Sequence, residues 1–487
     1  MRRIILPRPP ASPFPRVQDS PVFSAAGSVW ALLFGMGMLL LGNGLQGSLL
    51  GVRAAEESFG STVTGVVMSG YFVGFLIGSR LAPYTIRRVG HLRVFAAIGS
   101  LASIAILIQS AWITPTVWAL MRVVTGYCLA SAYIVAESWL NDRVTNEHRG
   151  GLLAVYMIVS YLGMGGGQLL LNTGTPSDSG LFILVSILIS FAVIPILLSI
   201  TPQPVQDQSE SLGVIALYRI SPLGLVGSFG SGILQGAVFG MGAVYARSAG
   251  LSVAQVSIFM FVLVAGAALF QWPIGKLSDR MDRRKVIAGL SGFGAIVSVA
   301  AVIATYGGPE LLIALSLLIG AGPMLLYSLF IAYTNDHLRP EQMVAASSTL
   351  ILIFGSGAIL GPSSAGALMD VVGPTGFLWV LALGQAGITG FALYRMTRTE
   401  TGPVEEQSPY SANPARTAAL SPALAEWVLE QEQDGTTRTG PEVASGADHP
   451  SDRGPDAVPD STQPHAGGLP EEPPLDQPRK TEDDMRP

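Results

Sequence analysis

Arg122 is the residue whose chemistry stands out first, because it lies within a long apolar run. An arginine inside a membrane-length segment is expensive and usually faces a cavity or a partner, where its guanidinium can bind an anion or influence proton transfer. Arg122, Gly126, Ala130, Tyr133 and Glu137 follow helical spacing and form one stripe. Arg122 and Glu137 are 15 residues apart, about 22 Å along a helix, so they cannot pair directly. We favour anion binding by Arg122 over the alternative that its side chain only extends to the membrane interface.

Glu137 falls at the inner end of the same run, within reach of Arg149 and of the basic pair Arg87-Arg88. The favoured interpretation is an ion pair that closes the cytoplasmic side and breaks when the conformation changes, because a group biases such an equilibrium only by interacting differently with the two states. A role in proton coupling is the second interpretation.

Amide side chains recur on two other apolar runs. Asn43 and Gln46 are three residues apart and share a helical face, and Ser228, Ser231 and Gln235 share another. Two interpretations are open, namely hydrogen bonding to a polar substrate and polar contact between helices. We favour Asn43, Gln46 and Gln235 as substrate-binding residues, because a buried amide is harder to satisfy than a hydroxyl.

Two tyrosines complete the set of candidate binding residues. Tyr156 shares a face with Ser160, Gly163 and Gly167, and Tyr327 in the tenth apolar run is a candidate aromatic gate. Close helix packing would equally explain the glycine-rich face.

These residues need membrane-spanning helices to position them. The chain of 487 residues is 49% hydrophobic and only 13% charged, whereas a soluble chain carries about 25% charged residues. Twelve apolar runs are each close to the ~20 residues that cross a bilayer. They are predicted at 28–50, 62–82, 93–112, 115–137, 150–172, 180–200, 220–245, 253–273, 286–306, 310–333, 344–367 and 375–396.

The remaining segments are polar and rich in proline. Residues 1–27 are expected to be a disordered lead, and 201–219 a cytoplasmic linker between an N-terminal bundle at 28–200 and a C-terminal bundle at 220–396. The tail at 397–487 is acidic and expected to be disordered, since it cannot bury enough apolar surface to fold alone. One short amphipathic helix around Trp427 is the candidate contact for a protein partner.

The basic residues predict the orientation. Nineteen Lys and Arg fall on segments that would be cytoplasmic, and two, Arg53 and Arg247, fall on outer loops. This asymmetry places both termini in the cytoplasm of a multi-pass protein of the cell (inner) membrane.

One charged stretch, Gln271 to Lys285, carries a family pattern. It follows an apolar run, and Pro273 and Gly275 can end a helix there. The segment resembles the loop between the second and third helices of a half-bundle in the major facilitator superfamily. The residues that match are Gly275, Leu277, Ser278, Asp279, Arg280 and Arg283, while Asp282 replaces the second glycine of the pattern. The loop 83–93 takes the same place in the first half, with Arg87 where the pattern has Asp.

The fourth apolar run strengthens the resemblance. Arg122 and Gly126 are similar to the superfamily's Arg-x-x-x-Gly signature, and the stretches 134–139, 149–157 and 271–275 resemble the uncharacterised YcaD-type branch. The resemblance implies an all-α membrane protein with two pseudo-symmetric six-helix bundles and the activity of a secondary transporter. It also implies that the first and seventh helices line a central cavity. The second-half candidates that match the first-half ion pair are Asp279 with Arg280, and Asp336 after the tenth apolar run.

We therefore expect a secondary active or facilitative transporter of a small polar or anionic solute, working by alternating access. The alternative is a transporter-fold receptor or scaffold that signals through the acidic tail. An enzyme is not expected, because no nucleophile is paired with a base. No cofactor, metal site or nucleic-acid surface is expected. The protein is expected to be a monomer. Coupling to a proton or ion gradient is left open, because no Asp or Glu lies mid-span and all five histidines are expected in loops or the tail.

Overall fold

Twelve long helices make up the core of the computed structural model, which describes residues 30–142, 146–198 and 212–398. Each is long and apolar enough to cross a membrane, which confirms the twelve predicted spans. No strand occurs in these ranges. The helices are α2 (Trp30–Glu56), α3 (Ser61–Val89), α4 (His91–Ala111), α5 (Pro115–Asp142), α6 (Asn146–Leu169), α7 (Gly180–Leu198), α9 (Pro222–Ser248), α10 (Val253–Ser278), α11 (Arg283–Ala304), α12 (Pro309–Asn335), α13 (Pro340–Val372) and α14 (Gly376–Met396).

Two short elements complete the described chain. The 3-10 turn η2 (Leu170–Thr173) extends α6, and α8 (Val214–Ile220) precedes α9. The linker reaches α13 through the Leu212 N–H, which donates to the Ala345 carbonyl at 3.2 Å. The predicted lead 1–27, most of the linker and the tail with its helix around Trp427 lie outside the described residues.

Several helices run further than their apolar stretches. α3 continues through Pro83 to Val89, so the loop predicted at 83–93 is wrong except near Gly90. α10 likewise continues through Pro273 and Gly275, which do not end it. The physical reason is that a helix satisfies its own backbone groups, so it can leave the hydrocarbon without unwinding. Only Gly90, with φ of 97°, requires the left-handed backbone that breaks the chain between α3 and α4.

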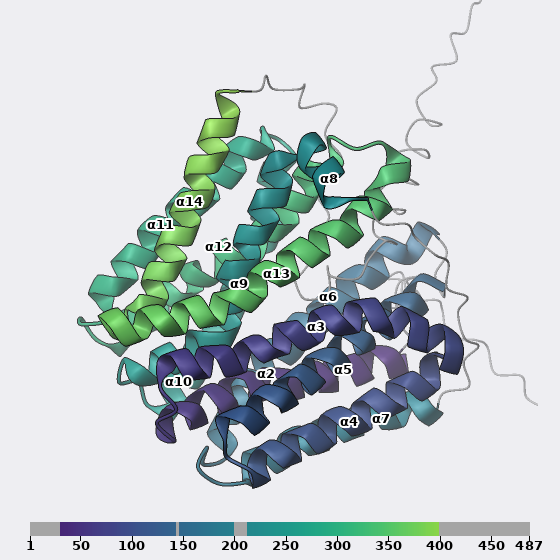
Figure 1. Ribbon diagram of the computed structural model, residues 1–487, viewed down its shortest axis with the longest axis vertical. Helices are drawn as coiled ribbons and strands as arrows, with labels where there is room; N and C mark the ends of the chain where they lie inside the picture. The colour runs from purple at the N-terminus through teal and green to yellow at the C-terminus, as the bar shows by residue number, and fades with distance from the viewer. Residues whose placement is uncertain (1–29, 143–145, 199–211, 399–487) are drawn as a thin grey trace, which may run out of the picture. The chain divides into compact units, whose positions relative to one another are not determined.

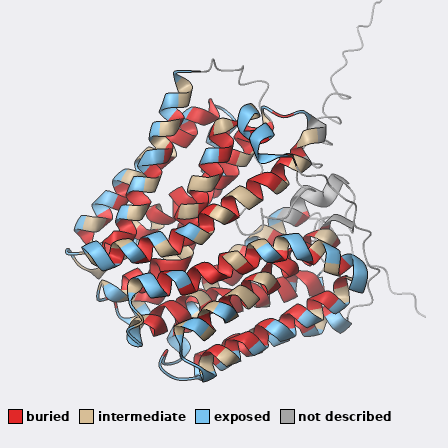
Figure 2. Cartoon of the chain, in the orientation of Figure 1, coloured by how far each residue is buried: buried red, intermediate tan, exposed pale blue. Residues whose placement is uncertain are grey.

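The helices form two sets of six, α2–α7 and α9–α14 (Figure 1). Within the first set α3 packs on α5, and α2 on α6 and α7; in the second, α9 packs on α13, α10 on α12 and α11 on α14. Buried residues line the helix faces that meet other helices (Figure 2). The remaining faces carry exposed large apolar residues such as Leu162, Ile296 and Leu383, as expected for a surface that meets lipid.

The two halves meet where α3 packs on α13, α2 on α9 and α6 on α10. We call the α3–α13 and α6–α10 contacts the two seams. In the first seam the Ser69 Oγ donates to the Ile359 carbonyl at 2.6 Å and lies 2.8 Å from the Ser363 Oγ. A Cβ at Gly65 would overlap the Pro362 carbonyl, so the backbones touch there. Glycine is required at this crossing because any side chain would push the halves apart.

The second seam is also polar. The Asn172 Nδ2 donates to the Ser257 Oγ at 2.9 Å, and that hydroxyl donates to the Gln168 carbonyl at 2.7 Å. The Tyr161 hydroxyl donates to the Gln271 Oε1. On α3 these contacts fall within about the first two and a half turns, and on α6 within about the last two and a half. Both stretches lie next to the end of the bundle where α2 is followed by α3. We call this the α2–α3 end, and the opposite end the α3–α4 end.

Candidate functional site

Arg122 lies against an aromatic ring. Its side chain is buried, and its Cζ is 4.6 Å from the centroid of the Tyr71 ring on α3. One turn further on, a Cβ at Gly126 would overlap the Tyr71 carbonyl, so α3 and α5 touch at the backbone. This close approach is what brings the guanidinium over the ring, where the negative face of the π system stabilises the cation.

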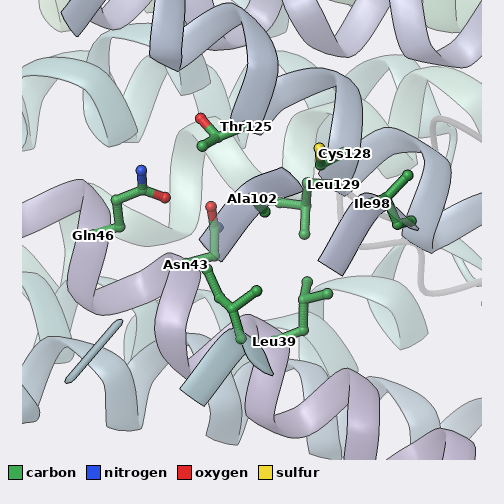
Figure 3. A pocket seen from close by; sticks show the side chains of 9 residues that line it. Leu39, Asn43, Gln46, Ile98, Ala102, Thr125, Cys128 and Leu129 are labelled. Carbon is green, nitrogen blue, oxygen red and sulfur yellow. The ribbon is translucent and has the colours of Figure 1, made fainter. Parts of the chain in front are cut away.

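Asn43 and Gln46 line one small cavity inside the first half (Figure 3). The cavity is about 20 Å³, enough for roughly one water molecule. The Asn43 Nδ2 is buried and has no hydrogen-bond partner in the described part of the chain, whereas the Gln46 Nε2 donates to the Gln109 Oε1 at 3.1 Å. The walls come from α2, α4, α5 and α7: Leu39, Asn43, Gln46, Ile98, Ala102, Thr125, Cys128, Leu129 and Ile189.

The hydrogen bonds of Gln46 continue into a short chain. The Gln109 Nε2 donates to the Trp118 carbonyl at 3.4 Å, and the Trp118 Nε1 donates back to the Gln109 carbonyl at 2.9 Å. Gln46 is therefore joined to α4, and the two amides predicted as a pair differ. One holds helices together, and the other offers a donor to the cavity.

Glu137 and Tyr156 form a second buried group. Glu137 is 7% exposed, and its Oε2 has no hydrogen-bond partner among the described residues; Tyr156 on α6 is also buried, with Ser160 beside its hydroxyl. Glu137 and Tyr133 both interact electrostatically with Tyr156. Arg149 lies in the first turns of α6, but its side chain is outside the described part of the structure. The predicted Glu137–Arg149 ion pair stays a prediction.

Next to this group, His91 is buried rather than in a loop, which corrects the expectation for this histidine. It is the first residue of α4, and its Nε2 lies 3.0 Å from the Ser138 Oγ. Its ring stacks on Trp139 with centroids 6.4 Å apart. The reason is that α4 begins immediately after Gly90, so His91 already faces α5 rather than water.

Gln235 and Tyr327 lie in the second half. The Gln235 Nε2 donates to the Pro323 carbonyl at 3.0 Å, which joins α9 to α12. Tyr327 is fully buried, its ring centroid is 4.4 Å from that of Phe354, and its hydroxyl has no hydrogen-bond partner. Of the six predicted binding residues, the cavity of Figure 3 contains Asn43 and Gln46 alone. The other four are distributed over α5, α6, α9 and α12.

The charged stretch after α10 is organised around Arg283. This side chain is 1% exposed, and its Nη1 lies 3.2 Å from the Asp336 Oδ1 and its Nη2 3.5 Å from the Asp279 Oδ1. Arg280, matched with Asp279 in the sequence, is exposed. Two buried neighbours, Arg284 and Asp282, pair at 3.1 Å.

In the equivalent region of the first half, the described residues show no such network. Arg87 lies in the last turn of α3, is exposed, and makes no ion pair within the described residues. The segments around Arg87 and Arg283, which differ in charge by sequence, therefore also differ in burial.

Three contact residues were not singled out from the sequence: Tyr71, Gln109 and Gln168. Gln109 and Gln168 are amides inside apolar runs, the same signal that pointed to Asn43. Tyr71 gives no such signal, because an aromatic residue in an apolar run is ordinary core until its neighbours are known.

Comparisons with known proteins agree with this architecture. The family profile of the Major Facilitator Superfamily matches residues 32–239 and 224–429. An uncharacterized MFS-type transporter YcaD of Shigella flexneri is 31% identical over 349 residues, which is 70% of this chain and 89% of that protein. The YcaD protein of Escherichia fergusonii is 29% identical over 378 residues, 77% of this chain and 97% of the relative.

Solved structures share the fold at lower sequence identity. The nucleoside transporter NupG superposes with a TM-score of 0.60 at 16% identity, over 76% of this chain and all of that one. A bacterial homologue of the human lysosomal transporter Spinster, inward-facing and unoccupied, gives 0.59 at 15% identity, over 85% and 98%. Because the profile spans both six-helix sets and the YcaD relative is covered nearly end to end, this multi-pass membrane protein belongs to the Major Facilitator Superfamily of transporters.

Proposed function

We propose that this protein is a secondary transporter that moves a small polar or anionic solute across the cell (inner) membrane by alternating access. The observation that carries the proposal is the nature of the two seams. They join the halves through hydroxyl, amide and backbone contacts, and the Arg247–Glu56 ion pair at 3.9 Å adds a polar contact between α9 and α2. Contacts of this kind can separate and re-form, because each side can be satisfied by water when the seam opens.

The orientation is the second part of the proposal. The α2–α3 end carries Arg53 and Arg247, while the α3–α4 end carries basic clusters such as Arg87-Arg88 and Arg283 to Lys285. The positive-inside asymmetry makes the α3–α4 end cytoplasmic and the α2–α3 end external. We assign the conformation to a state closed to the outside, because its two seams lie next to the proposed external end.

Solute recognition is assigned to Arg122 together with the buried amide and phenol groups that have no protein partner. Among the described residues, Asn43 and Tyr327 each present such an atom. A buried polar group left without a partner is unfavourable. A solute that supplied the missing hydrogen bonds would be bound selectively over an apolar one. The cationic Arg122 favours solutes with a carboxylate or another anionic group.

Coupling to a proton gradient is assigned to Glu137. Among the described residues Glu137 and Asp282 are the buried carboxylates; Asp282 is paired with Arg284, and the side chain of Arg149, the predicted partner of Glu137, lies outside the described part of the structure. A carboxyl group inside a membrane-spanning helix is a candidate proton site, because a change in its exposure between states would take up or release a proton.

A reversible cross-link tests alternating access. In a Cys128→Ala background, which removes the sole cysteine, Ser69→Cys and Ser363→Cys place two thiols where hydroxyl oxygens lie 2.8 Å apart. This spacing suits a disulfide. Oxidation should abolish uptake of a radiolabelled panel of nucleosides, sugars and carboxylates into proteoliposomes, and a reductant should restore it.

Each single-cysteine variant, oxidised in the same way, is the control and should transport normally. Unchanged uptake by the cross-linked protein would contradict alternating access through the α3–α13 seam.

A further inference from the structure

A carboxylate of the second half caps a helix of the first half. Asp370, near the end of α13, accepts a hydrogen bond from the Ser61 backbone N–H at 3.1 Å and another from the Thr62 N–H at 2.9 Å. These are the first two residues of α3. Asp370 is 309 residues away from Ser61 in sequence.

α3 has no side-chain cap of its own. Its N-cap position is Gly60, with φ of 78°, and no side chain accepts a hydrogen bond there from the first turn. The first N–H groups of a helix lack partners within the helix and carry a partial positive charge. The Asp370 carboxylate supplies both the acceptors and the negative charge that this terminus needs.

The corresponding helix of the other seam caps itself. At the start of α10, the Ser252 Oγ accepts from the Gln255 N–H at 3.3 Å, and the Gln255 Oε1 accepts from the Ser252 N–H at 2.9 Å. Its contact with the first half is neutral, through the amide of Asn172 and the hydroxyl of Ser257. Opening therefore leaves α10 capped, whereas it leaves α3 without its cap.

The geometry of the α3–α13 seam keeps Asp370 within reach only while the halves touch. A Cβ at Gly366 would overlap the Ser61 carbonyl, so the two backbones are in contact one turn before Asp370. A displacement that separates these backbones also separates the carboxylate from the N–H groups, because a hydrogen bond weakens steeply beyond normal length.

We propose that Asp370, by capping α3 from the other half of the same chain, holds the external entrance closed. We call this contact the clasp. The clasp contributes to the closed state and contributes nothing once the seam opens, so it shifts the conformational equilibrium of the whole protein toward the closed state. That this end is external is part of the proposed function, and the inference rests on it in this respect. The contact itself and its effect on opening do not depend on that assignment.

The test uses a reporter on the opposite seam. In full-length protein in nanodiscs, with Cys128→Ala, a Ser257→Cys thiol is buried until the α6–α10 seam opens. Asp370→Ala should raise its labelling rate with a maleimide roughly three- to thirty-fold, the population change that matches the usual worth of an N-cap. Asp370→Asn, which keeps one acceptor oxygen, should give a smaller increase.

A second variant removes a donor instead of the acceptor. Ser61→Pro deletes one of the two N–H groups, and proline is well tolerated at the first position of a helix, so α3 should remain intact. It should raise the labelling rate in the same direction and by less than Asp370→Ala. The matched control is Glu310→Ala, which removes an exposed carboxylate from the first turn of α12, at the same end of the bundle.

Labelling rates for Asp370→Ala and Ser61→Pro equal to that of Glu310→Ala would overturn the clasp. It would also be overturned if Asp370→Ala exposed a Ser69→Cys reporter on its own seam but left Ser257→Cys protected, since this means local fraying without opening. No solute is needed, so a panel that gave no uptake would count against the proposed function and not against this result.

Discussion

The guanidinium of Arg122 lies 4.6 Å from the centre of the Tyr71 ring, on two helices that touch at the backbone beside Gly126. The buried cation is therefore held by a neighbouring helix of the same half. A ring face stabilises a cation without neutralising its charge, which is consistent with the anion binding proposed for Arg122.

Removing this cation should impair anion transport. We expect Arg122→Ala to lower uptake of an anionic solute by roughly ten- to a hundredfold, the usual consequence of losing a charge-assisted hydrogen bond. Arg122→Lys should lose less, because it keeps the charge without the planar stacking. Arg80→Ala, an exposed arginine of the same half, is the control. Normal anion uptake by Arg122→Ala combined with Gln235→Ala would remove both residues from the site.

The α3–α5 contact should tolerate no side chain at Gly126. We expect Gly126→Ala to lower the free energy of unfolding by roughly 1–3 kcal/mol or more, because the added methyl overlaps the Tyr71 carbonyl and the helices must separate. Thermal unfolding of the detergent-purified protein measures this. At Gly47 an added Cβ meets nothing within 4 Å, so Gly47→Ala should be neutral or slightly stabilising. Equal melting temperatures for the two variants would refute the close contact.

Glu137 should confer pH dependence. A carboxyl that exchanges a proton with one side of the membrane makes uptake depend on pH, and its amide cannot. We expect wild-type uptake to respond to a change from mildly acidic to mildly alkaline pH and Glu137→Gln to be insensitive to it. Tyr156→Phe keeps the carboxyl and should keep a pH response. A Glu137→Gln profile that overlays the wild-type profile would assign proton coupling elsewhere.

Arg283 should matter more than its exposed counterparts. It is 1% exposed and its partner Asp336 is 11% exposed, so Arg283→Gln should destabilise the protein by roughly 3 kcal/mol or more, as breaking a buried ion pair does. Asp279→Asn should be milder, because Asp279 is 40% exposed and solvent screens its pair. Arg87→Gln should leave the melting temperature unchanged. If Asp279→Asn and Arg87→Gln slowed transport equally, the two charged segments that contain them would act only as determinants of topology.

Many individual residues of the candidate site could be predicted from the sequence, but which of them contact one another could not. Asn43 and Gln46 share the face that their spacing predicts, and both line one cavity. That this cavity lies inside one half, and that Gln46 is joined to Gln109, follows from the packing of α2 on its neighbours. The exposure of Arg280 and the burial of Arg283 are likewise decided by where α11 begins, and neighbouring arginines look alike in sequence.

The sequence by itself determined the number of membrane helices, their division into two sets of six and the family. The reason is that hydropathy over about 20 residues is a local property, and the bilayer thickness makes it a nearly sufficient criterion. Only the tertiary structure decided which polar groups meet. The Asp370 carboxylate and the first residue of α3 are 309 residues apart. The local sequence of a helix with glycine at its N-cap does not reveal that the capping side chain comes from the other half.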